Sequence, residues 1–237
     1  MALLRKMPPV VVERAELLKF GKVWKENGGR LSRTPPCSSM ELGQVLDRAV
    51  GKSLAELLGG IPVAAPGAGA LSAPEDDCVE VGHVRVIGGV RPQNFDVGYR
   101  PDGLRFAYDS KTLNDEKSIR KNWQNMINDL ATEATTVHVR FPHAVVAFVV
   151  MIPGPCIADT QRKAMIETLE RLARRVGVRN EAHMAEAISL VLWDPEDGTI
   201  DHEIPRPASP LRLEKFSEQV EAVYVARYKG LPPHAAE

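Results

Sequence analysis

Residues 94–111, NFDVGYRPDGLRFAYDSK, contain two runs of alternating apolar and polar side chains that are separated by Asp102-Gly103. Asp-Gly between two such runs predicts a β-hairpin, because these residues tolerate the positive φ angles of a type I′ turn. With this pair at the centre of the turn, the register places Asp96 directly opposite Asp109. The stretch therefore predicts a hairpin in which two carboxylates meet.

The two faces of this hairpin differ in character, since side chains alternate with a period of two. One face is apolar or aromatic and should pack on a core: Phe95, Val97, Tyr99, Leu104, Phe106 and Tyr108. The other is polar, with small residues at its middle: Asn94, Asp96, Gly98, Arg100, Arg105, Ala107, Asp109 and Lys111.

Like charges that oppose each other across a sheet are destabilising, so the facing aspartates need a reason. One reason is a shared divalent cation such as Mg²⁺, which prefers carboxylate oxygens and would lie beside Lys111. The other is a solvent-exposed face on which Lys111 only neutralises two aspartates. The hairpin alone leaves both interpretations open.

The remaining patterns predict an α/β fold, with a mixed central sheet flanked by helices. Ser38 or Ser39 is a suitable N-cap for the second helix. The segment from 61 to 77 is rich in Pro, Gly and Ala and is expected to be irregular. Helices are expected over 10–27, 40–58, 114–133, 159–176 and 211–228, and strands over 78–88, 94–100, 104–111, 144–152 and 187–193.

Asp96 followed by Asp109-Ser110-Lys111, in the order helix, three strands, helix, strand, resembles the PD-(D/E)XK nuclease superfamily. That superfamily includes many type II restriction endonucleases and several repair and recombination nucleases. The resemblance covers about 40–152 and implies a restriction-endonuclease-like core (α-β-β-β-α-β). Residues 1–39 would then be an N-terminal helical arm and 153–237 a C-terminal α/β extension, within one domain of residues 1–237. Phe95 departs from the family's proline, and a literal Pro-Asp at 101–102 lies at the wrong end of its strand.

The resemblance also implies roles for individual residues. Asp96 and Asp109 would bind Mg²⁺ with the carbonyl of Ser110, Lys111 would be the catalytic lysine, and Glu41 on the preceding helix would complete the metal site. Basic and amide side chains around the motif are expected to contact DNA: Arg100, Arg105, Lys117, Arg120, Lys121 and Gln124.

These observations predict a Mg²⁺-dependent endonuclease that hydrolyses phosphodiester bonds of double-stranded DNA, in the manner of a site-specific type II restriction enzyme. A homodimer would match its two-fold symmetry to a palindromic site. The alternatives are a structure-specific repair or recombination nuclease and a non-catalytic DNA-binding protein. The net charge of −1 excludes nothing. No apolar run is long enough to cross a membrane, the start lacks a signal peptide's apolar core, and the three cysteines form no metal motif, so we expect the cytoplasm.

Overall fold

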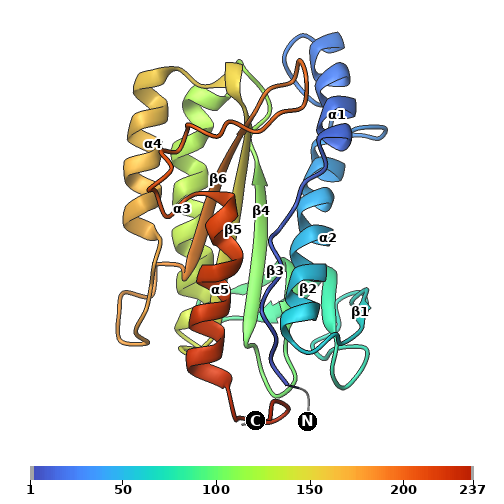
Figure 1. The fold of residues 1–237 in the computed structure, drawn as a ribbon, viewed down its shortest axis with the longest axis vertical. Helices are drawn as coiled ribbons and strands as arrows, with labels where there is room; N and C mark the ends of the chain where they lie inside the picture. Colours follow the sequence, from blue (N-terminus) through green and yellow to red (C-terminus); the bar gives the residue numbers. More distant parts are fainter. Residues whose placement is uncertain (1–2, 236–237) are drawn as a thin grey trace.

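The computed structural model describes residues 3–235 and is built around a six-stranded mixed sheet (Figure 1). The strands follow the chain in spatial order: β1 (Val63–Ala64), β2 (Val79–Ile87), β3 (Pro92–Tyr99), β4 (Phe106–Thr112), β5 (Val145–Pro153) and β6 (Ala187–Trp193). β2, β3 and β4 are antiparallel neighbours, whereas β4, β5 and β6 run parallel, as does the short pair β1 and β2. The expected α/β class with a mixed sheet is confirmed.

Helices cover both faces of this sheet. They are α1 (Arg14–Glu26), α2 (Ser39–Leu57), α3 (Ile119–His138), α4 (Asp159–Leu172) and α5 (Leu213–Tyr228), with a short 3-10 helix at Gly154–Cys156. α2 packs on β2, β3 and β4, and α5 packs on β5 and β6 beside it. α3 and α4 lie together on the opposite face (Figure 1). The helix connecting β4 to β5 is therefore on the other side of the sheet from α2.

The expected elements are present, but several limits differ. The two-residue strand β1 lies in the segment expected to be irregular. α3 begins at Ile119 rather than near Asn114, because Asn114 is fixed outside the helix: its Oδ1 accepts a hydrogen bond from the Leu31 N–H at 3.2 Å. α4 ends at Leu172, and the backbone at Ala173 is extended, so the expected continuation to 176 is wrong.

The hairpin has the predicted register but not the predicted turn. Val97 pairs with Tyr108 and Tyr99 with Phe106, as the sequence indicated. A type I′ turn needs positive φ at both central residues, and only Gly103 has it, at 128°. The connection is a wider loop, closed where the Arg105 N–H donates to the Tyr99 carbonyl at 2.9 Å.

Both faces of the hairpin are buried at their middle. The apolar face lies beneath α2 and α5, where the Tyr108 ring makes an edge contact with Phe216. On the polar face, Ala107 has no exposed surface and Asp109 is only 9% exposed, whereas Asn94 near the start of β3 is exposed. A solvent-exposed polar face, one of the two interpretations of the facing aspartates, is therefore wrong.

The N-terminal arm is helical only over α1. The residues before it run extended between α2 and α5, where the Arg5 N–H donates to the Leu57 carbonyl at 2.8 Å and the Ser217 hydroxyl donates to the Pro8 carbonyl at 2.7 Å. This segment holds the two helices of one face together over a continuous apolar core. None of the helices in residues 3–235 has the length and apolar character needed to cross a bilayer.

Candidate active site

The candidate site lies where β3 and β4 separate. Their ladder ends at the pair Val97 and Tyr108, and Asp96 and Asp109 are the next residues along the two strands. Beyond that point β3 pairs only with β2, and β4 only with β5. We call this point the β3–β4 fork. It leaves the Ser110 N–H of β4 without a partner on β3, and a side chain takes that place.

Asp96 fills the gap at the fork. Its Oδ2 accepts a hydrogen bond from the backbone N–H of Ser110 at 2.9 Å and another from the Ser110 hydroxyl at 3.1 Å. The carboxyl groups of Asp96 and Asp109 lie close enough for each to shift the pKa of the other. The predicted meeting of the two carboxylates is confirmed. The amide and hydroxyl groups of Ser110 both bind the Asp96 carboxylate beside it.

The acidic residue that α2 brings to the fork is Asp47, not Glu41. Glu41 belongs to the N-terminal capping box of α2: its carboxylate accepts the Ser38 N–H at 2.8 Å, and the Ser38 hydroxyl accepts the Glu41 N–H at 3.2 Å. Asp47 lies about two turns further along, is 6% exposed and is close enough to Ser110 for that side chain to lower its pKa. The assignment of Glu41 as a metal ligand is not supported by this placement, since its carboxylate is engaged in the cap.

Lys111 is held between two carboxylates on the face of the sheet that α3 covers, opposite α2. Its ammonium group donates to Asp109 and, at 2.8 Å, to Oε1 of Glu133 on α3. Glu133 is 5% exposed, and its Oε2 has no hydrogen-bond partner in the described chain. Burial alone would lower the pKa of Lys111, but the charges of Asp109 and Glu133 outweigh it and raise that pKa. Lys111 is therefore a fixed cation.

The three aspartates face a cavity of about 300 Å³, which Ser39, Gly43 and Gln44 of α2 also line. His83 borders it from β2, at a β-bulge between Val81 and Val84. Bulges commonly redirect a side chain next to a functional site. A Cβ on Gly43 would lie 3.0 Å from the Ser110 hydroxyl, so only a small residue keeps this wall open.

Burial raises the pKa of each aspartate, and a neighbouring aspartate raises it further for Asp47 and Asp96. Burial, followed by the charge of Asp96, raises the pKa of Asp47 to about 8. Burial and the hydrogen bond with Asp109 raise the pKa of Asp96 to about 7. Burial raises the pKa of Asp109 to about 6, against the lowering effects of Asp96 and Lys111. Without a cation, the site therefore retains protons close to neutral pH, and a bound cation would displace them.

The donors fit Mg²⁺ in kind. All three carboxylates supply hard oxygen ligands, and Oδ1 of Asp47 is buried with no hydrogen-bond partner in residues 3–235. No three His, Cys, Asp or Glu side chains in that range are already arranged around an ion position. An ion shared by Asp96 and Asp109 would take the place of a proton held between their carboxyl groups.

The residues expected to contact DNA fall into two groups. Arg100 and Arg105 are inside the protein: Arg100 forms a buried ion pair with Glu80 at 2.6 Å, and Arg105 pairs with Asp102 and packs on the Tyr228 ring. Both guanidinium groups are engaged by the fold, which argues against a role in DNA contact. The other four lie exposed around the start of α3, outside the carboxylate cavity: Lys117, Arg120, Lys121 and Gln124.

Comparison with protein-family models, with characterised proteins and with solved structures found no match to this chain. The function must therefore be inferred from the residues that this fold brings together.

Sequence reasoning missed Asp47 and Glu133, although both carry the same signal. Asp47 continues the helical stripe of Gly43, Val50 and Leu54, and Glu133 lies in that of Met126, Leu130 and Val137; these stripes are otherwise buried. An acidic residue within a buried stripe is rare unless it is paired or functional. That signal could have identified both residues.

Proposed function

We propose that this protein is a Mg²⁺-dependent deoxyribonuclease of the PD-(D/E)XK type, and specifically a type II restriction endonuclease. With the two-residue strand β1 between α2 and β2 set aside, the order α2–β2–β3–β4–α3–β5 matches the helix, three strands, helix and strand of the core implied by the resemblance. Asp96 lies on the second strand of that core and Asp109-Ser110-Lys111 on the third.

The β3–β4 fork is the observation that carries the proposal. A sheet of this size has no structural need to place two aspartates in contact and a third within interacting range of them. Such an arrangement is expensive for the fold, because it keeps three carboxyl groups buried and raises their pKa values. Clusters of perturbed carboxyl groups in a cavity are characteristic of functional sites.

Within this proposal, each side chain has a defined task. Asp47, Asp96 and Asp109 hold the metal ion, with the Ser110 carbonyl as a further proposed ligand. A Mg²⁺ ion at these carboxylates would polarise a phosphoryl oxygen and lower the pKa of a coordinated water.

Lys111 acts as a cation rather than as a base in this proposal, because its pKa is raised. Its ammonium group is fixed by Asp109 and Glu133 and does not line the cavity, so in this proposal it would turn past Asp109 when substrate binds, to offset charge on the attacked phosphate and to orient the attacking water. Glu133 positions Lys111 from α3. His83 and Gln44, on the open side of the cavity, are available to hydrogen bond to the substrate phosphate.

The test is a cleavage assay with the purified wild type, Lys111→Ala and Asp96→Ala on plasmid and phage DNA, in Mg²⁺ and in EDTA. Lys163→Ala, on the exposed surface of α4, is a matched lysine control that should cut like the wild type. We expect discrete Mg²⁺-dependent fragments from the wild type and the control, and none from the two site variants.

Each other outcome has a defined meaning. End-trimming, or cutting confined to gaps and single strands, would replace the restriction enzyme with a repair or recombination nuclease on the same core. DNA binding without cleavage of any substrate would indicate a non-catalytic DNA-binding protein. Fragments cut symmetrically across a palindrome would support a cytoplasmic restriction enzyme acting as a homodimer, because two-fold symmetry then relates the two cuts.

A further inference from the structure

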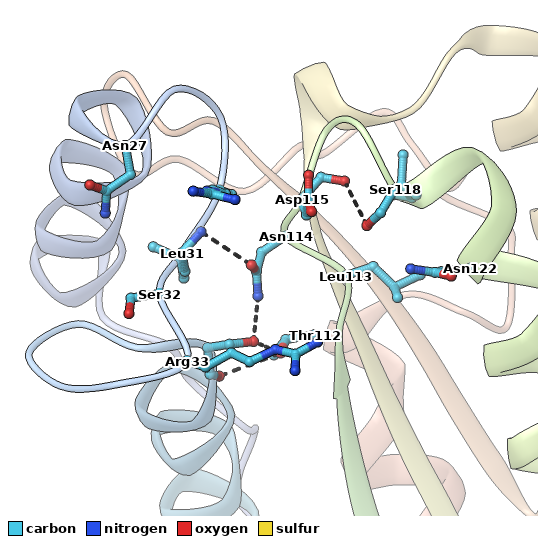
Figure 2. A pocket seen from close by; sticks show the side chains of 13 residues that line it. Asn27, Leu31, Ser32, Arg33, Thr112, Leu113, Asn114, Asp115, Ser118 and Asn122 are labelled. Atoms are coloured by element: carbon cyan, nitrogen blue, oxygen red, sulfur yellow. Dashed lines mark hydrogen bonds between the residues drawn. The ribbon is translucent and has the colours of Figure 1, made fainter.

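A second cavity adjoins the candidate active site. It has a volume of about 630 Å³ and shares Ser39 and Thr112 with the cavity at the β3–β4 fork. The Ser39 and Thr112 hydroxyl groups lie 3.0 Å apart. The two cavities therefore border each other at this hydroxyl pair, and the second one lies at the carboxyl end of β4 (Figure 2).

The walls of this second cavity are fixed by hydrogen bonds. One wall is the connection between α1 and α2, and the other is the connection between β4 and α3. Asn114 joins them: its Oδ1 accepts the Leu31 N–H at 3.2 Å (Figure 2), and its carbonyl accepts the Trp24 indole N–H at 2.7 Å. The cavity is thus a built feature of the fold, formed before any ligand binds.

The lining is cationic and rich in hydrogen-bond donors. Arg30 and Arg33 both line the cavity, both are exposed, and neither side chain has a partner within residues 3–235. Two acidic residues are nearby: Asp115, whose carboxylate accepts the Lys117 N–H at 3.0 Å, and Glu116, whose carboxylate lies beside Gly29. The first turn of α3, which forms one rim, contains no acidic residue. Neither carboxylate forms an ion pair with Arg30 or Arg33, so both guanidinium groups are free to bind an anion in the cavity.

None of the described lining residues is aromatic; most are Arg, Asn, Ser or Thr. Nucleobases held by single-strand binding sites stack on aromatic rings, whereas backbone phosphates are held by arginine, hydroxyl and amide groups. The lining therefore suits a phosphate and not a stacked base. Arginine in particular binds phosphate oxygens with two parallel hydrogen bonds.

We propose that this cavity binds a backbone phosphodiester of the same DNA strand whose bond lies at the fork, with Arg30 and Arg33 as the phosphate ligands. This inference rests on the proposed nuclease function and adds a subsite to it. Ser39 and Thr112, at the junction of the two cavities, lie along the path of the strand. The α1–α2 connection thereby sets where along the strand the bond is cut.

The inference can be tested by DNA binding without cleavage. Fluorescence anisotropy with a labelled duplex, in EDTA and over a series of KCl concentrations, compares the wild type with Arg30→Ala/Arg33→Ala. Each lost phosphate contact reduces the salt slope by about 1, so the double variant should lose about 2 from that slope and roughly tenfold or more in affinity. In the Mg²⁺ cleavage assay its KM should rise while kcat changes little.

The matched control is Arg171→Ala/Arg179→Ala, which removes two exposed arginines near the opposite end of the molecule, around the end of α4 (Figure 1). An identical salt slope in both double variants, with the wild type binding and cutting DNA, would overturn the phosphate subsite and leave the proposed function standing. A wild type that neither binds nor cuts DNA would overturn both.

A third experiment distinguishes a site for a DNA backbone phosphate from a site for a small free anion. Inorganic phosphate alone is titrated against the wild type and the cavity variant, with thermal unfolding as the readout. Stabilisation by phosphate that depends on Arg30 and Arg33, together with DNA binding that does not, would assign the cavity to a small anion and overturn the strand proposal. Dependence of DNA binding on both arginines supports it.

Discussion

Replacing Asp47 with asparagine should make the metal-free protein more stable. Asp47 is 6% exposed, its Oδ1 has no hydrogen-bond partner within residues 3–235, and it lies close enough to Asp96 for their charges to repel. Asparagine keeps the shape of the side chain and removes the charge. It also removes a ligand that the proposed Mg²⁺ site requires.

The size of the effect follows from the pKa of Asp47, which burial and Asp96 raise from 3.8 to about 8. Each pKa unit corresponds to about 1.4 kcal/mol between folded and unfolded states. The amide must find new hydrogen bonds, which offsets part of the gain. We expect Asp47→Asn to raise the free energy of unfolding by about 2 kcal/mol at pH 8 in EDTA.

The sign of the pH dependence is fixed by the direction of the shift. An acid whose pKa is raised by folding contributes its full stability below pH 3.8, and this contribution is lost as pH rises towards about 8. The wild type should therefore become less stable between pH 4 and pH 8, and Asp47→Asn should lose less. Urea unfolding at several pH values, in EDTA, measures the difference directly.

Two further measurements make this prediction sharp. Asp129→Asn, the same change at an exposed position on α3, should shift stability by no more than about 0.5 kcal/mol. Saturating Mg²⁺ should stabilise the wild type and not Asp47→Asn. A difference between Asp47→Asn and wild type that is the same at every pH, or a loss of stability at pH 8, would refute the reasoning.

Three other substitutions test neighbouring parts of the structure. Lys111→Met leaves two buried carboxylates unpaired and should cost about 3–5 kcal/mol in urea unfolding, part of which Lys111→Met/Glu133→Gln should recover. Glu41→Ala removes only a helix cap, so it should cost about 1 kcal/mol and retain Mg²⁺-dependent cleavage; loss of cleavage in folded protein would return Glu41 to the site. Gly51→Ala places a Cβ 2.3 Å from the Val81 side chain, so thermal unfolding should show a net loss of about 1–2 kcal/mol despite alanine's better helix propensity.

The hairpin shows how far local sequence information reaches. Alternation fixed which residues share a face, and the register that brings Asp96 and Asp109 together is present in the structure. The predicted turn type was wrong, because Asp-Gly forms a type I′ turn only when no flanking side chain binds the aspartate and holds the loop in another shape. Here Arg105 pairs with Asp102 and holds a wider loop.

The other members of the site depend on contacts between distant elements. Glu41 and Asp47 are both acidic residues on α2, and only the packing of α2 on β4 decides which one faces the fork. Glu133 reaches Lys111 because α3 crosses to the opposite side of the sheet from α2. Arg100 and Arg105 appeared available for DNA because their buried partners, Glu80 and the Tyr228 ring, come from distant segments.

The β3–β4 fork has a consequence for the timing of activity during synthesis. Its aspartates come from α2, β3 and β4, and the second partner of Lys111 comes from α3. β4 is an interior strand whose other neighbour, β5, is made after α3. A nascent chain that has emerged only through the hairpin thus holds the motif without its assembled surroundings. In a nuclease of this design, hydrolysis would begin only once the sheet is complete, which protects nucleic acid close to the ribosome from a half-made enzyme.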